Sequence, residues 1–173
     1  ILSIIRRLPK ESPGIVVTQH MPAGFTKMFA DRLNHLCGIS VSEAKNGDRV
    51  QPGTALIAPG DKQMTVQKDG KGYYVRCVEG EKVSGHCPSV DVLFRSVADK
   101  VGKSSIGVIL TGMGKDGAAG LLKMHEAGAF TIGQDKDSSV VYGMPKEAFE
   151  LKAVTKQASL DDIPRVIVEY LNK

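Results

Sequence analysis

The sequence predicts an α/β fold, a doubly wound and mostly parallel sheet into which an antiparallel hairpin is inserted. Short apolar segments alternate with longer segments of amphipathic helical spacing along the 173 residues. The clearest unit spans residues 106–135, where an apolar segment, a glycine-rich loop, a helical segment and a second apolar segment follow one another. Residues 64–78 instead carry two strand-like segments around a glycine turn, which indicates a hairpin.

In the first half of the chain, residues 1–8 have the pattern of the end of a helix, which Pro9 terminates. Ile15–Val17 is expected to be a buried strand, and residues 39–43 and 55–58 two further strands. Between the first two, Phe25–Leu36 has the spacing of an amphipathic helix. We expect its apolar stripe to face the core, and this stripe consists of Phe25, Met28, Phe29, Leu33 and Leu36.

In the second half, a helix is expected to begin after Ser89, a plausible N-cap. A buried strand at 107–110 and another at 129–133 flank a helix that Gly128 terminates. Residues 138–143 look irregular or like a short strand, and Pro145 suits the first turn of a helix at 146–151. A last amphipathic helix is expected at 159–172, with its inward residues being Leu160, Ile163, Val166, Ile167 and Tyr170.

The composition excludes several classes of function. A formal net charge of +4, spread along the chain, is too small to indicate a nucleic-acid partner. No apolar segment approaches the ~18 residues of a membrane span, so no membrane insertion is expected. The start of the chain lacks a signal-peptide pattern, and Cys37, Cys77 and Cys87 are expected to be reduced thiols, which together favour the cytoplasm. His86 beside Cys87 suggests a metal ligand pair, but no second pair has fitting spacing, so no metal and no cofactor are expected.

The glycine-rich loop after the strand at 107–110 allows three interpretations. Gly112, Gly114 and Gly117 match the GxGxxG pattern of a dinucleotide site, and Asp135 falls where a ribose-binding acid would lie. The position late in the chain and the carboxylate of Asp116 beside the expected pyrophosphate count against that interpretation. The loop is equally compatible with catalysis, or with a close turn that has no chemical role.

The catalytic interpretation joins two strand-end loops. His20 follows the strand Ile15–Val17, and Asp116 follows the strand at 107–110. A doubly wound sheet brings such loops to its carboxyl edge. A carboxylate that accepts from one imidazole nitrogen fixes the tautomer and leaves the other nitrogen as a base. Taken alone, however, His20 also fits an ordinary loop histidine and Asp116 an ordinary helix N-cap.

Five motifs in a fixed order add a resemblance that covers essentially the whole chain. These motifs are Gln19-His20-Met21-Pro22-x-Gly24-Phe25-Thr26, Ala58-Pro59-Gly60-Asp61, Pro88-Ser89-Val90-Asp91-Val92-Leu93-Phe94, Leu110-Thr111-Gly112-Met113-Gly114-x-Asp116-Gly117-Ala118 and Tyr142-Gly143-Met144-Pro145-x-Glu147-Ala148. Together they closely resemble the catalytic domain of the chemotaxis protein-glutamate methylesterases, the CheB family. Five spaced motifs are far more specific than one GxGxxG pattern.

The resemblance implies a hydrolase of γ-glutamyl methyl esters on methyl-accepting chemotaxis receptors, which releases methanol and in some members also deamidates glutamines. It implies a Ser-His-Asp triad without a cofactor, in which His20 and Asp116 match the histidine and the aspartate. The backbone N–H of Met113 matches part of the oxyanion site. The implied partners are the receptors and the protein's own N-terminal receiver domain.

The family's serine lies in a Gly-x-Ser-Thr-Gly-Gly turn after the first strand, and no such turn occurs before His20. Ser3 is expected on a helix and is no substitute. We therefore expect residues 1–173 to be the methylesterase domain without its N-terminal strand, its nucleophile turn and its receiver domain, and to be inactive alone. The alternative is a receptor-binding module without hydrolase activity.

Overall fold

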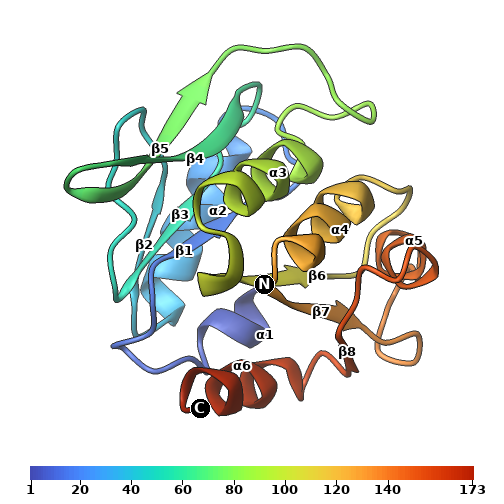
Figure 1. Ribbon diagram of the computed structural model, residues 1–173. Coiled ribbons are helices and arrows are strands. Elements are labelled where there is room, and N and C mark those ends of the chain that lie inside the picture. The colour runs from blue at the N-terminus through green and yellow to red at the C-terminus, as the bar shows by residue number, and fades with distance from the viewer. The chain divides into compact units, whose positions relative to one another are not determined.

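The computed structural model describes residues 1–173, which fold as two compact units, residues 1–93 and 94–173 (Figure 1). The first unit begins with the helix α1 (Leu2–Ile5) and the strand β1 (Ile15–Val17). It continues with the helix α2 and the strands β2 to β5, which are α2 (Phe25–Leu36), β2 (Ser40–Glu43), β3 (Thr54–Ile57), β4 (Gln63–Asp69) and β5 (Gly72–Val78).

The first unit has a parallel sheet with the strand order β1-β3-β2. Ile15 is paired with Ala55, and Val41 is paired with the same residue from the other side. The core of this unit packs residues of α1 and α2 against the sheet, and its buried members are Ile5, Ala30, Leu33, Ile39, Val41, Ala55 and Ile57. The strands β4 and β5 form the predicted antiparallel hairpin, longer than expected, with Asp69 paired to Gly72 at its tip.

The boundary between the units falls inside the helix α3 (Val90–Lys100), which a short 3-10 turn at Gly102–Ser104 follows. The elements of the second unit are β6 (Ile106–Ile109), α4 (Ala118–Glu126), β7 (Phe130–Gln134), α5 (Met144–Glu150), β8 (Lys156–Ala158) and α6 (Ile163–Leu171). The strands again form a parallel sheet, in the order β6-β7-β8.

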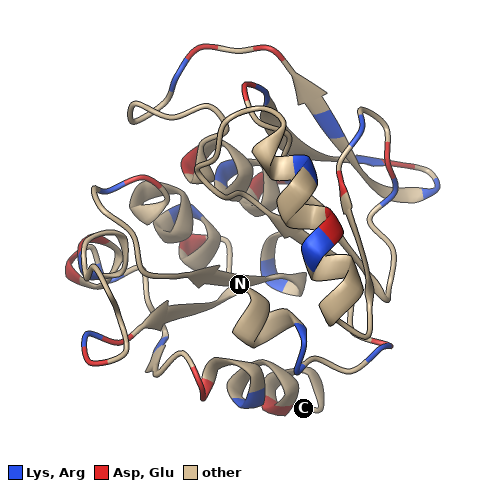
Figure 2. Ribbon diagram, turned by 180° about the vertical axis from the view of Figure 1, so that it is seen from behind, with Lys and Arg blue, Asp and Glu red and all other residues tan.

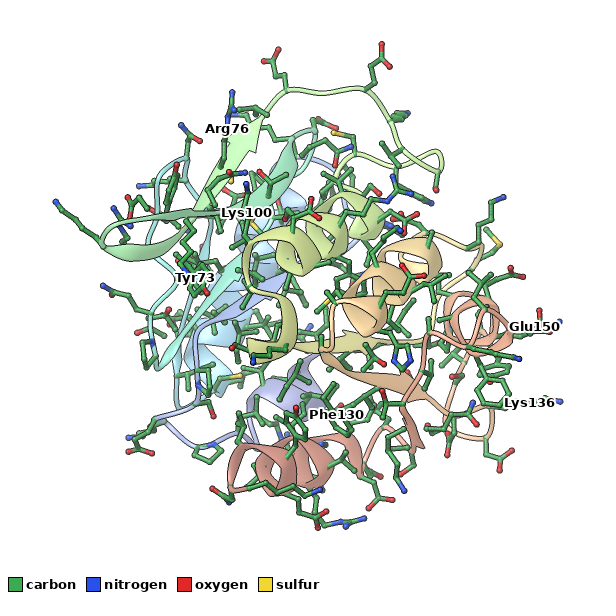
Figure 3. All side chains as sticks on the ribbon, viewed as in Figure 1. Tyr73, Arg76, Lys100, Phe130, Lys136 and Glu150 are labelled. Atoms are coloured by element: carbon green, nitrogen blue, oxygen red, sulfur yellow. The ribbon has the colours of Figure 1, made fainter.

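Helices cover both faces of the second unit's sheet. Leu121 of α4 packs so closely over Gly107 of β6 that a Cβ there would overlap it. On the opposite face, the Phe130 ring of β7 stacks on Tyr170 of α6, with ring centroids 4.2 Å apart (Figure 3). Phe130 is paired with Ile106, one residue before Gly107, so the two helices lie on different sides of the sheet. The α/β fold with parallel strands and an inserted antiparallel hairpin is therefore confirmed.

Charged positions are interspersed over loops and exposed helix faces, while β6 and β7 carry none (Figure 2). None of the helices combines the length and the apolar character that crossing a bilayer requires.

The expected inward stripe of α2 is confirmed for Leu33 and Phe29, which lie in or against the core. It is wrong for Phe25, Met28 and Leu36, which are more than half exposed, whereas Thr26 and Ala30 are buried. The buried Thr26 hydroxyl takes part in the hydrogen bonds described below, which explains how a polar side chain is accommodated there. The hydrophobic periodicity of residues 25–36 does not indicate which polar side chain finds a buried hydrogen-bond partner.

Several element boundaries also differ from expectation: α5 begins at Met144 rather than residue 146, and α6 begins at Ile163 rather than residue 159. The first helix, α1, ends at Ile5 rather than near residue 8. The strand β8 was not expected, because Lys156–Ala158 (KQA) carries no apolar alternation. The strand forms because it pairs with β7, and the sequence of these three residues does not indicate this pairing.

Candidate active site

The expected site residues all lie in loops that follow the carboxyl ends of parallel strands. His20 follows β1 in the first unit, and Met113 and Asp116 follow β6 in the second unit. Ligands of open α/β sheets bind at this edge. Met113 and Asp116 lie in one loop, between β6 and α4.

In the first unit, the loop after β1 is fixed by the loop after β3. Gly60 lies against the backbone of Pro22 and Ala23, so that a Cβ at Gly60 would overlap both. The Gly60 N–H donates to Thr26 Oγ1 at 3.0 Å, and the Thr26 hydroxyl donates to Glu43 Oε1 at 2.5 Å. Thr26 is fully buried, and these hydrogen bonds join the start of α2 to the end of β2 and to the loop after β3.

The imidazole of His20 stacks face to face on the imidazole of His86. The ring centroids are 3.6 Å apart and the planes differ by 5°. Both rings are half-buried and border an open pocket of about 330 Å³. The rest of its lining is formed by Met21, Pro22, Asp61, Lys82, Gly85, Cys87 and Pro88. A histidine at the wall of such a pocket is suited to take up and release a proton from a bound group.

Cys87, in the same pocket, is poorly suited to act as a nucleophile. Burial raises the pKa of its thiol, and the carboxylate of Asp61 raises this pKa further, against a smaller opposite effect of Lys82. The thiol is therefore protonated at neutral pH, and the thiolate is the reactive form. No group of three or more His, Cys, Asp or Glu side chains in residues 1–173 is arranged to hold a metal ion.

In the second unit, the glycine-rich loop is fixed at its start by Thr111. The backbone N–H of Thr111 donates to Gln134 Oε1 at 2.8 Å. The Thr111 hydroxyl donates to the carbonyl of Val141 at 3.0 Å and accepts from the Val141 N–H at 2.9 Å. The Gly112 N–H also donates to the Val141 carbonyl, and the Met144 N–H donates to the Gly112 carbonyl at 2.8 Å. The loop is thus tied to β7 and to the segment before α5.

Close packing explains why Gly112 and Gly143 are glycines. The sulfur of Met144 occupies the space where a side chain at Gly112 would lie. A Cβ at Gly143 would lie 2.6 Å from the carbonyl oxygen of Gly112. Met113 is 82% exposed, and its backbone N–H takes no part in the hydrogen bonds that hold the loop.

Asp116 is 1% exposed, directly before the helix α4. The N-cap position of α4 is Gly117, with φ of 90°. Asp116 therefore lies one residue before the N-cap position that the N-cap interpretation gave it. A carboxylate buried to this degree has to be hydrogen-bonded or paired.

The dinucleotide interpretation gains no support from Asp135. Its carboxylate accepts from the Ser138 N–H at 2.9 Å and from the Ser138 hydroxyl at 2.6 Å, and so closes a turn after β7. The first glycine of the GxGxxG pattern, Gly112, packs against Met144. Gly114 and Gly117 have φ of 88° and 90°, so the packing of Gly112 and the left-handed backbone of the other two account for the three glycines.

Sequence reasoning missed three residues that shape these loops. Thr26 belongs to the motif that begins at Gln19, but no role was predicted for it. His86 was considered only as a metal ligand. Gln134, fully buried at the end of β7, gave no signal, because a glutamine at a strand end is not distinctive. Ser3 lies within α1, as expected.

Comparison with known proteins first defines the class of the fold. The crystal structure of the CheB methylesterase catalytic domain of Thermotoga maritima matches with a TM-score of 0.94 and 38% sequence identity. The match covers 98% of this chain and 90% of that one. The fold is therefore that of a CheB methylesterase catalytic domain.

The sequence comparisons then give the family. The sequence model of the family described as CheB methylesterase matches residues 1–167, and the chain belongs to this family. A relative from Syntrophomonas wolfei, called protein-glutamate methylesterase/protein-glutamine glutaminase 2, is 54% identical over all 173 residues. The similarly named protein 3 of Shewanella oneidensis is 55% identical over 167 residues, 96% of this chain. The chain spans about half of these relatives, 51% and 47% of their lengths.

Proposed function

We propose that the full-length protein hydrolyses γ-methyl esters of glutamate side chains on methyl-accepting chemotaxis receptors and releases methanol. The observation that carries this proposal is the family match over residues 1–167. It is supported by relatives named protein-glutamate methylesterase/protein-glutamine glutaminase at 54% identity. Their second name supports deamidation of receptor glutamines as a further activity of the same site.

We assign His20 as the general base, because its ring borders the pocket in the first unit. Asp116 is assigned the role of holding the imidazole in the productive tautomer and orientation. The nucleophile is assigned to a serine in the residues that precede Ile1 in the full-length protein. The same upstream residues are proposed to supply the first strand of the sheet and, before it, a receiver domain that regulates the enzyme in the cytoplasm.

The reaction is an acyl transfer in two halves. The serine oxygen attacks the ester carbonyl carbon while its proton passes to His20, and the backbone N–H of Met113 donates to the resulting oxyanion. The tetrahedral intermediate collapses, the C–O bond to methoxide breaks, and His20 returns the proton so that methanol leaves. Water then attacks the acyl-enzyme with His20 as base, and the glutamate carboxylate and the free serine are released. With a glutamine substrate, ammonia leaves in place of methanol.

The test measures methanol release from methylated receptor membranes by the full-length protein and by residues 1–173 alone. We expect release by the full-length protein only. Substitution His20→Ala or Asp116→Asn in the full-length protein is expected to lower kcat at least about a hundredfold. Asp116→Asn keeps the size of the side chain and removes only its charge, so a rate within tenfold of wild type would contradict the role of Asp116.

The control variant is His35→Ala, since His35 lies exposed on α2 and bonds only the carbonyl of Asp31. Its rate is expected to equal that of the wild type. Release by residues 1–173 at the full-length rate would place the nucleophile within these residues. Receptor binding without hydrolysis by the full-length protein would instead favour the binding module.

A further inference from the structure

We propose that His86 is a positioning residue, which sets the plane of the His20 ring for proton transfer. This inference rests on the proposed function, because it concerns the proposed base. The observation that carries it is the stack of the two imidazoles, with centroids 3.6 Å apart and planes 5° from parallel.

The distance between the two ring centroids is shorter than the range preferred by isolated aromatic pairs. Isolated aromatic pairs prefer offset or edge-to-face arrangements with centroids roughly 4.5–7 Å apart. The rings of His20 and His86 overlap instead, which requires that the backbone on both sides holds them there.

On the side of His86, the backbone forms a tight hairpin turn. The Val83 N–H donates to the carbonyl of His86 at 2.9 Å, and the His86 N–H donates to the carbonyl of Val83 at 3.0 Å. Ser84 and Gly85 at the tip have φ of 51° and 83°, the left-handed pair that a two-residue turn of this kind requires. The turn places His86 directly after its tip.

The turn is fixed to the first unit by the side chain of Gln63, which is 6% exposed on β4. Its amide nitrogen donates to the carbonyl of Glu81 at 2.9 Å and to the carbonyl of His86 at 3.2 Å. Its oxygen accepts from the Ser89 N–H at 2.9 Å. One buried side chain thus holds the backbone on both sides of His86, which keeps the His86 ring beside that of His20.

On the side of His20, the loop is fixed by the contact of Gly60 with Pro22 and Ala23. The backbone under His20 is therefore held. The flat surface of His86 adds a restraint on rotation of the His20 ring out of the plane of the stack. A base whose ring tilts out of that plane does not direct its nitrogen at the nucleophile, so the stack is expected to act on kcat rather than on KM.

The test compares His86→Ala and His86→Phe in the full-length protein. Alanine removes the surface, whereas phenylalanine keeps a flat ring without a titratable nitrogen. We expect His86→Ala to lower kcat about 10- to 100-fold with KM within about twofold, and His86→Phe to restore kcat to within about fivefold of wild type. The matched control, His35→Ala, is expected to change neither constant.

A second measurement follows the stack without reference to catalysis. In proton NMR of histidine-labelled protein, the ring protons of His20 are shielded by the neighbouring ring, and we expect them to move downfield in His86→Ala but not in His86→Phe. Unchanged kcat in His86→Ala would overturn the positioning role. Equal losses in both variants, with unfolding at lower urea concentration, would also overturn it and assign His86 a structural role.

The outcomes separate this inference from the proposed function. Hydrolysis by the wild type that is insensitive to His86→Ala rejects the positioning role and leaves the proposed function in place. No hydrolysis by the wild type rejects the proposed function and the positioning role with it, whatever the NMR spectra show about the stack.

Discussion

The side-chain oxygen of Gln134 accepts a hydrogen bond from the backbone N–H of Thr111 at 2.8 Å, which ties the end of β7 to the loop after β6. The amide nitrogen of Gln134 donates to the carbonyl of Ser138, also at 2.8 Å. Because Gln134 is fully buried, no water replaces either bond if this side chain is changed. The loop that carries Met113 and Asp116 therefore depends on a residue outside it.

Substitution Gln134→Leu keeps the approximate volume and removes both bonds. We expect the free energy of unfolding to fall by about 1–3 kcal/mol, because two part-buried backbone groups lose the buried side chain that bonds them. Urea denaturation measures this loss. Gln157→Leu is the control, since its partly exposed side chain makes one bond, to the Tyr142 hydroxyl at 2.8 Å, and about 1 kcal/mol or less is expected. Equal losses in the two variants would contradict the special role of Gln134.

The hydroxyl of Thr26 is tested by comparing Thr26→Val with Thr26→Ser. Valine has the same shape but leaves the Gly60 N–H without its acceptor and Glu43 without its donor. We expect a loss of about 1–3 kcal/mol for valine, and a smaller loss for serine, which keeps the hydroxyl. Thermal unfolding of both variants is the measurement. A serine variant as unstable as the valine variant would show that the methyl group, not the hydroxyl, matters.

Gly143→Ala tests the close approach of two backbone segments. The added Cβ would lie 2.6 Å from the carbonyl oxygen of Gly112, and backbone atoms do not move aside cheaply. We expect a loss of more than about 2 kcal/mol in the free energy of unfolding. Gly70→Ala is the control, because nothing lies within 4 Å of its added Cβ, and a change within about 0.5 kcal/mol is expected. Similar stabilities of the two variants would show that the backbone of the loop moves to make room for the added Cβ.

The thiol of Cys77 gives a prediction on pH. Burial, followed by the charges of Asp48 and Glu43, raises the pKa of this thiol from 9.0 to about 11. Because the pKa is raised in the folded state, the contribution of Cys77 to stability is fully present below pH 9 and is lost as the pH rises through about 11. We expect a fall in the free energy of unfolding across this interval, which urea denaturation at several pH values measures.

The control for this pH prediction is Cys77→Ala, in which the part of the fall due to the thiol should vanish, whatever the effect of the substitution at pH 7. Alkylation followed by mass spectrometry gives an independent measure. In the folded protein, the rate at Cys77 should rise only as the pH approaches 11. A rate that follows an ordinary thiol near pH 9 would show that Cys77 is less buried than the structure indicates.

Much of the fold was predictable because its signals are local. The bounds of α2 and β1 were predicted correctly, and so was the hairpin, whose two strands are divided by a glycine turn. The strand–loop–helix–strand order of residues 106–135 was also confirmed, since glycines and an apolar period mark each transition.

What the sequence did not contain was the identity of buried polar partners. The inward position of Thr26 on α2 was not predicted, because its bonding partner Glu43 lies 17 positions away. His86 was separated from His20 by more than sixty positions, so their stack had no local pattern. The roles of His20, Asp116 and Met113 stay predictions until the kinetic tests are made.

The hairpin of β4 and β5 has a practical use. At its tip, the Lys71 N–H donates to Asp69, and the space around Gly70 is open (Figure 1). A turn whose shape is fixed by its neighbours and whose outer side faces solvent is a suitable place for a short insertion. A fluorophore or an affinity tag attached between Gly70 and Lys71 would label the protein at a turn that contains none of the proposed site residues.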